Sequence, residues 1–276
     1  MTTIPLPVYL ANMLDALRAQ YDAMAATFGP PRIVLLGKMP VYRYSKQSDT
    51  LLCFLKGAKL VSTLNACVVL HSAGYAQEMY ALIRVADDCC SDIIFMLIPK
   101  NGTNFDANQE RFFHDFYQEE FADTGDVLGS HQKRDTVTRR HIHASFARMA
   151  KEVVNPSDIQ TTTTVIHNVF SGYVHSAYPH IMELYGGDPG QFHLKGMAGT
   201  PRQGEAARCL TDQCHRAIMA SELVAKKIGF AECAAVIRDL LKEFETTLRL
   251  FPSDNPAELM RKAKKKCKRP VTAAGG

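Results

Sequence analysis

Histidines with helical spacing are the residues of this sequence best placed to do chemistry. Residues 167–193 hold four of the ten histidines of the chain. His167, Ser171 and His175 are spaced at i, i+4 and i+8, so they share one face of a helix. Imidazole can act as a general base or a metal ligand, or pair with phosphate when protonated. The spacing therefore predicts a candidate site on this helix, where the Ser171 hydroxyl hydrogen-bonds either imidazole.

A second polar group lies on an apolar helix predicted over residues 65–98, with or without a break. His71, Tyr75 and Glu78 are spaced at i, i+4 and i+7 and share a face of it. Burying an ionised Glu78 without a partner would cost several kcal/mol, so we expect it to pair with a residue of the histidine helix. The resulting hypothesis is a buried Glu/His/Ser cluster whose candidate catalytic residues are Glu78 and His175. An inert polar network in the core is the alternative.

A glycine-rich loop is predicted over residues 186–206, and we expect it to cover the histidine helix. Loops of this length in compact domains are usually functional covers or disordered. The sequence lacks a GxxxxGK[ST] motif, so the phosphate-binding loop of nucleoside triphosphatases is excluded. The residues expected to contact a ligand are His71, Tyr75, His167, Ser171 and His193. The ligand or cofactor itself stays open, and no metal site is predicted, since the spacing of Cys209, Cys214 and His215 is not that of a zinc site.

Apolar residues recur with helical spacing over most of the chain, while strand-like alternation is nearly absent. Helices are predicted over residues 7–27, 48–64, 65–98, 104–121, 134–154, 157–178, 203–228 and 231–251, and residues 32–46 are either a short strand or irregular. The fold class expected is therefore all-α, a multi-helix bundle with a long central helix and the glycine-rich loop. One helical domain is expected over residues 1–255, with two subdomains meeting near 99–103 as the alternative.

Charge is distributed unevenly along the 276 residues. The net charge is +4, but residues 261–276 hold seven Lys or Arg and no acid, so the rest of the chain is left with −3. We expect residues 256–276 to form a basic disordered tail, with weak contact to RNA or an anionic surface as its possible partner role. The acidic remainder argues against a folded nucleic-acid-binding surface. Assembly into a homo-oligomer stays open.

The cysteine pattern and the apolar segments bear on the cellular compartment in which the protein is expected. The eight cysteines include no CxxC pair and lie mostly in apolar helical patterns, as is typical of a reducing compartment. No basic region precedes the apolar residues at the start of the chain, and no apolar run is long enough to span a bilayer. A cytoplasmic protein without a membrane span is therefore expected.

A resemblance to known proteins rests on two stretches of the chain. The segment AGYAQEMYALIRV carries Glu78, and it precedes an N-x-x-S-x-x-V-H pattern that ends at His175 and continues as SGYVHSAYPHIMELYGG. Together these resemble a family of uncharacterised bacterial all-helical proteins, a domain of unknown function, which implies a helical fold without an assigned activity. The chain is more distantly similar to abortive-infection and HEPN-type helical proteins, several of which cut RNA with an Arg-x4–6-His motif.

Three functions follow as hypotheses. The leading one is a helical binding or regulatory protein that uses the Glu/His/Ser cluster. A HEPN-like, metal-independent ribonuclease of a defence or toxin system is the first alternative, with Arg134 holding the phosphate and His141 acting as general base. This pair departs from the family motif, because its spacing is Arg-x6-His and no arginine stands five to seven residues before His175. A metal-dependent hydrolase built on the cluster is the second alternative. Whether the chain is an enzyme is left undecided.

Overall fold

The structure, a computed structural model, describes residues 5–97, 105–120, 132, 134–149 and 156–248. Within these ranges the chain is mostly helical, as predicted from the sequence. The helices are α1 (Leu6–Ala25), α2 (Asp49–Ser72), α3 (Ala76–Leu97), α4 (Ala107–Tyr117), α5 (Arg139–Met149), α6 (Pro156–Val174), α7 (Tyr178–Met182), α8 (Pro201–Ile228) and α9 (Ala231–Leu248). The strands are β1 (Arg32–Leu36), β2 (Met39–Arg43), β3 (Tyr185–Gly186) and β4 (Gln191–Phe192), and they form two antiparallel hairpins, β1–β2 and β3–β4.

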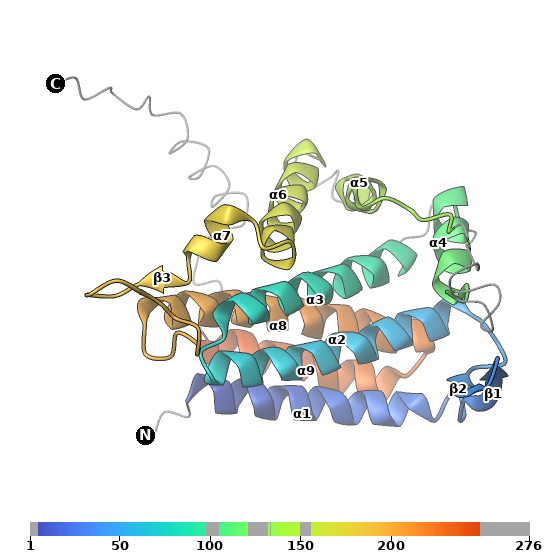
Figure 1. Cartoon of the computed structure of the whole chain (residues 1–276). Helices are drawn as coiled ribbons and strands as arrows, with labels where there is room; N and C mark the ends of the chain where they lie inside the picture. The colour runs from blue at the N-terminus through green and yellow to red at the C-terminus, as the bar shows by residue number, and fades with distance from the viewer. Residues whose placement is uncertain (1–4, 98–104, 121–131, 133, 150–155, 249–276) are drawn as a thin grey trace.

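Five helices, α1, α2, α3, α8 and α9, run side by side and form a bundle (Figure 1). Their apolar residues recur at helical spacing, so each helix turns one stripe toward a shared core. Leu14, Leu52, Leu64, Ile83 and Ile218 are fully buried there. The helix α2 packs against α1, α3 and α8 and therefore lies at the centre of the bundle.

The central helix of the sequence analysis is two helices in the structure. Helicity is continuous through residues 64 and 65 but stops before Gly74, which has a φ of +83° and so takes a backbone conformation that other residues rarely adopt. The Met197 N–H donates to the Gly74 carbonyl over 2.7 Å, and a Cβ at Gly74 would lie 2.3 Å from the Ala198 nitrogen. The turn between α2 and α3 is therefore shaped to receive the segment before α8.

Several other predicted elements differ from the structure. Residues 32–46 contain the hairpin β1–β2. The region expected as one loop over residues 186–206 contains all of the hairpin β3–β4 except Tyr185, and the first six residues of α8. The helix α4 begins after Asp106, whose carboxylate accepts from the Gln109 N–H at 2.8 Å. The predicted subdomain boundary at 99–103 and the basic tail at 256–276 lie outside the described residues.

One described helix, α2, is long and apolar enough to cross a membrane. It spans 24 residues, and 56% of its most apolar window is buried inside the protein. The side chains that make α2 apolar are those that contact α1, α3 and α8, so its composition is explained by its central place in the bundle.

A smaller layer, made of α5 and α6, lies over α3. These two helices have their main contacts with each other and with α3 (Figure 1). The C-terminal end of α6 is held by aromatic rings, since Tyr173 and Phe170 pack on Tyr80 of α3 with centroid distances of 4.7 and 6.1 Å. The N-terminal part of α5 is held by charges, which form the site described below.

Close packing between α1 and α2 gives the first prediction. A Cβ at Gly57 would lie 2.0 Å from the hydroxyl oxygen of Tyr21, a buried side chain that donates to Ser221 on α8. We expect Gly57→Ala to lower the free energy of unfolding by about 1–3 kcal/mol, because overpacking outweighs the better helix propensity of alanine. Urea denaturation followed by circular dichroism measures it.

The matched control is Gly204 on α8, where an added Cβ meets nothing within 4 Å. We expect Gly204→Ala to raise the free energy of unfolding by about 0.5–1 kcal/mol. Equal effects of the two substitutions would contradict the packing of Tyr21 against α2.

Candidate functional site

The helices α5 and α6 place polar side chains toward α3 by simple helical spacing. Arg139 and His143 are at i and i+4 on α5, on the side that also buries Ile142 completely. His167 is on the face of α6 turned toward α3, with 14% of its side chain exposed. The three helices therefore bring a guanidinium and two imidazoles together over the middle of α3.

Charged residues below these side chains form what we call the ionic cluster: Lys56, Arg84, Asp87, Asp88, Asp92, Arg139 and Arg216. The carboxylate of Asp92 has no exposed surface and is held by Lys56 Nζ at 2.7 Å and Arg139 Nη1 at 2.5 Å. The cluster links α2, α3, α5 and α8. Its four cations face the three carboxylates of the cluster, and Arg216 also faces the carboxylate of Asp212 on α8.

The other two carboxylates of the ionic cluster are also held by arginine. Asp88 pairs with Arg84 one turn before it and with Arg139 Nε at 3.2 Å. Asp87, which is buried, pairs with Arg216 of α8. Burial lowers the pKa of both Arg139 and Arg216, but the neighbouring carboxylates outweigh it and leave each pKa above its usual value.

The protonation state of His167 follows from its contact with Arg84. Arg84 Nη2 lies 2.9 Å from His167 Nε2. Because a guanidinium keeps its protons and only donates, Nε2 must accept, which leaves the ring proton on Nδ1. Nδ1 points toward Asp88 Oδ1 at 3.9 Å, too far for a hydrogen bond. His167 is therefore neutral in this arrangement, and its lone pair is already occupied.

The second imidazole, that of His143, lies beside the first. The two rings are 5.3 Å apart between centroids and meet edge to face. Burial lowers the pKa of His143, and His167 lowers it further. Burial also lowers the pKa of His167, followed by the positive charge of Arg84. Both imidazoles thus resist protonation despite the carboxylates nearby.

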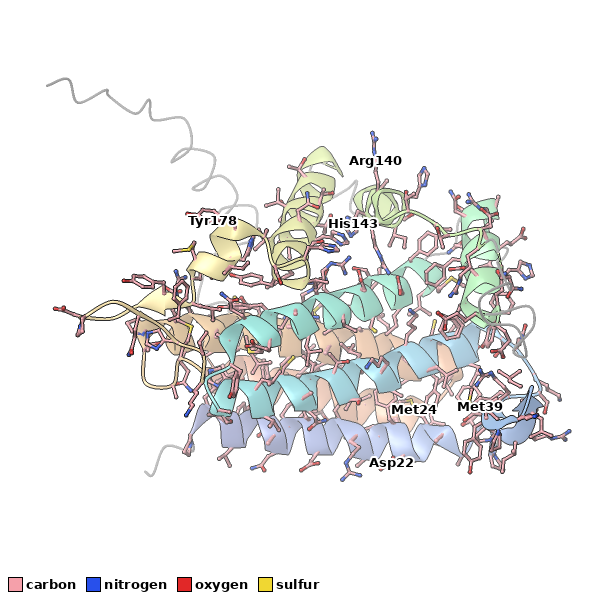
Figure 2. The ribbon with its side chains drawn as sticks, in the orientation of Figure 1. Asp22, Met24, Met39, Arg140, His143 and Tyr178 are labelled. Carbon is pink, nitrogen blue, oxygen red and sulfur yellow. The ribbon has the colours of Figure 1, made fainter. Side chains whose placement is uncertain are left out.

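A pocket of about 440 Å³ opens between α5 and α6 above the ionic cluster. Its wall is formed by Arg139, Arg140, His143, Thr161, Thr164, Val165, His167 and Asn168, and it contains no carboxylate. Figure 2 shows Arg140 pointing away from α3 into solvent, with His143 between α5 and α6. Arg140 pairs with no carboxylate among the side chains that the structure describes. The pocket therefore offers donors and positive charge to an anion.

A cation fits this place less well. Oxygen and nitrogen atoms of Asp87, Asp88 and His167 lie within 4.8 Å of one another, the spacing of a metal site. However, arginines already hold both carboxylates, and His167 Nε2 already accepts from Arg84. A divalent ion would have to displace guanidinium groups that cannot lose their charge. The carboxylates and the imidazole that could bind a metal are therefore already paired with arginines.

The cluster predicted from the sequence is not assembled as expected. Of its residues, His167 faces α3, but Glu78 and His175 are both exposed. The expectation of a buried Glu78 is wrong because α6 crosses α3 at Arg84 and Asp88, whereas α7 packs over the start of α3. There the Gln77 amide donates to the His180 carbonyl, and Glu78 faces solvent.

The remaining predicted ligand-binding residues lie apart from the pocket. His71 is buried at the end of α2, where its Nε2 is 3.1 Å from the Gln203 carbonyl and its own carbonyl accepts from the Gln203 amide. Tyr75 is half-buried in the turn before α3, and Ser171 is half-buried on α6. His193 follows β4 and is half-buried there. His71 thus ties α2 to α8 and has a structural role.

The residues of the ribonuclease hypothesis are separated by their contacts. Arg134 donates to the Asp115 carboxylate at 2.7 Å and to its carbonyl at 2.6 Å, which turns it toward α4. His141 is exposed and pairs with Thr138 at 3.1 Å. No described interaction joins Arg134 to His141.

The principal residues of the pocket, Arg139, Arg140 and His143, are not among the site residues predicted from the sequence. A signal for two of them exists, since Arg139 and His143 have the i, i+4 spacing that places side chains on one helix face. The long-range partners, Asp92 and Lys56, have no comparable signal, because a residue spacing reveals only neighbours within one helix.

Comparisons with models of known protein families, with curated proteins and with solved structures find no match to this chain. Any assignment of function therefore depends on the geometry of its own residues.

The neutral imidazoles predict how stability depends on pH. Because the folded pKa of His143 and of His167 lies below the usual value of 6.5, the unfolded chain takes up protons more readily than the folded chain. Their contribution is complete above about pH 6.5 and is lost as the pH falls below it. We expect the melting temperature to drop between about pH 7.5 and 5.5, and thermal denaturation at the two values measures it.

The double variant His143→Gln/His167→Gln should show a smaller drop, while His175→Gln, which alters an exposed histidine, should keep the wild-type drop. An unchanged pH dependence in the double variant would mean that the two imidazoles titrate alike in the folded and unfolded chain.

Proposed function

We propose that this protein is a binding protein, regulatory in role, whose α5–α6 pocket holds a phosphate-bearing ligand. One observation carries the proposal: two arginines, two histidines and two threonines line a pocket whose wall has no carboxylate. Phosphate oxygens accept from guanidinium and hydroxyl groups at once, which suits such a wall.

The ionic cluster supports this choice of ligand. Its cations hold the buried carboxylates beneath the pocket, so that these acids do not repel an anion, and Arg140 adds a positive charge at the rim. Arg139 is fixed by Asp88 and Asp92, so little side-chain entropy is lost when it meets a ligand. An anion therefore meets positive charge that is already positioned.

A neighbouring hollow favours a nucleotide over a bare phosphate. A hollow of about 300 Å³ lies between α6 and α8. Its wall is mostly apolar, with Ile83, Val169 and Phe170 among its residues, and Asp212, Gln213 and Arg216 add polar groups to it. Val165 lines both this hollow and the polar pocket. A ligand with a phosphate and a flat apolar group, such as a nucleoside phosphate, can contact both sides of Val165.

We further propose that the protein works in the cytoplasm of a bacterium. The seven described cysteines are all free and are buried or half-buried, which suits a reducing compartment. The bacterial origin rests on the resemblance of the segments around Glu78 and His175 alone.

Direct binding measurements test the proposed function. We expect ATP to bind more tightly than pyrophosphate, because only ATP can fill the apolar hollow as well. Arg140→Gln should weaken both about tenfold or more, since it removes a charged partner of the phosphate. Isothermal titration calorimetry with ATP and with pyrophosphate measures these affinities.

The matched control is Arg208→Gln, which removes an exposed arginine of α8 outside the pocket. Equal losses in the two variants would reduce the effect to net charge, and no binding of either probe to the wild type would contradict the proposal.

A second candidate function is metal-independent cleavage of RNA, favoured by the closeness of the two imidazoles beside Arg139 and Arg140. In this reaction the 2′-hydroxyl oxygen attacks phosphorus while the P–O5′ bond breaks, giving a 2′,3′-cyclic phosphate and a 5′-hydroxyl. His143, whose ring lines the pocket, would take the 2′-hydroxyl proton, and water would protonate the departing 5′-oxygen. This assignment uses residues of the pocket in place of Arg134, whose guanidinium is bound to Asp115, and of His141.

Incubation of labelled single-stranded RNA with the protein in excess EDTA tests this candidate. We expect cyclic-phosphate ends in the wild type and their loss in His143→Gln, while pyrophosphate still binds to that variant. His141→Gln, an exposed histidine of the same helix, should cleave normally. Cleavage that persists in His143→Gln would show a contaminating nuclease, and no cleavage by the wild type would leave binding as the role of the pocket.

A further inference from the structure

The hairpin β1–β2 projects from one end of the bundle and exposes apolar side chains (Figure 1). Ile33, Leu35, Met39 and Tyr42 are 63–71% exposed, and Val34 is 37% exposed. Within the described residues, β1 and β2 pair only with each other. An isolated two-stranded hairpin is marginally stable in water, so this one gains from a further strand.

The two edges of the hairpin differ in what they can bond. The turn has two residues, Gly37 and Lys38, so the flanking pair Leu36 and Met39 is a hydrogen-bonded pair. Alternation along the register then turns the backbone groups of Ile33 and Leu35 on β1 outward. It turns those of Pro40 and Tyr42 outward on β2.

Only the β1 edge is fully competent to accept another strand. Pro40 occupies an outward position of β2 and has no N–H to donate. At the end of β2, Arg43 is also bound to Glu119 with nitrogen–oxygen distances of 2.5 and 2.8 Å. Ile33 and Leu35, by contrast, offer two N–H groups and two carbonyls on the edge of β1, with no proline and no acid between them.

We propose that β1 pairs in antiparallel fashion with β1 of a second copy of this chain. The outward positions are two residues apart, so a two-fold axis at Val34 places Ile33 opposite Leu35 of the partner subunit, and the reverse. This register forms four backbone hydrogen bonds, the most that the two outward residues of each copy can make. It also puts Arg32 opposite Leu36 of the partner subunit, so no like charges face each other.

The same register explains the apolar composition of the hairpin. In a four-stranded sheet, Ile33 lies beside Leu35 of the partner subunit, and the two Val34 side chains meet at the axis. Pro30 and Pro31 precede β1, so the paired segment cannot extend beyond its five residues. A short, apolar, self-complementary edge of this kind fits a reversible dimer.

Cysteine cross-linking tests the register in the full-length chain with Cys267→Ser as the common background. Val34→Cys places two thiols at a non-hydrogen-bonded pair on the axis, where the Cα atoms lie about 4.5 Å apart, close enough for a disulfide. We expect mild oxidation to convert most of this variant to a covalent dimer. Tyr42→Cys is the control, because the two β2 strands would be three strand spacings, about 14 Å, apart.

Equal cross-linking of the two variants would show random collision and would overturn the proposal, as would the absence of cross-linking at Val34. The apparent mass gives an independent measurement. In sedimentation equilibrium, the apparent mass of the wild type should rise with protein concentration from 30.7 kDa toward twice that value.

Leu35→Pro removes an outward N–H without touching a bond between β1 and β2, so it should stay at the monomer mass with an unchanged helical circular dichroism spectrum. Tyr42→Ser, which removes exposed apolar surface but leaves the β1 edge intact, should still dimerise. A wild type that stays monomeric, or a Leu35→Pro variant that dimerises like the wild type, would overturn the proposal.

Discussion

The arrangement of the α5–α6 layer depends on the ion pairs of the Asp92 carboxylate. This carboxylate is fully buried in α3 and contacts Lys56 of α2 and Arg139 of α5. A buried ion is costly unless it is paired, and removing one partner of a buried pair typically costs about 3–5 kcal/mol. The requirement to pair Asp92 therefore fixes where α5 lies on the bundle.

This one constraint also determines the chemistry of the pocket. Because Arg139 turns inward to Asp92 and Asp88, its neighbour Arg140 is left on the outer side of α5. The position of α5 also brings His143 against His167, where burial and the nearby cations keep both rings neutral. A stability requirement in the bundle thus leaves a pocket with donors and without acids.

The sequence predicted the helices well but not which of their residues meet. Apolar residues at helical spacing reveal a helix, so α1, α8 and α9 were located to within a few residues. A break in the helix over residues 65–98 was left open, but its position at Gly74 could not be predicted because it depends on a contact with Met197, far along the chain. Glu78 was misplaced for a similar reason: its face on α3 could be read, but the point where α6 crosses α3 could not.

Among the pocket residues, the same limit applies. Arg84 and Asp88 are one helical turn apart, a spacing that the sequence itself displays, whereas the pairing of Asp87 with Arg216 spans 129 positions. A single sequence does not reveal which residues so far apart along the chain are in contact. It does show that charged residues such as Asp87 stand within an apolar helix and need a partner, and the structure identifies that partner as Arg216.

The α5–α6 layer is attached to the bundle in two different ways, and this has a consequence for its motion. Near Tyr173, α6 is held by stacked aromatic rings, whereas α5 is held largely by ions. Loss of one charge partner leaves a buried ion unpaired and so loosens α5, whereas the ring packing of α6 depends on no charge. The layer would therefore open as a hinged flap, with the aromatic end as its pivot and the pocket at its moving edge.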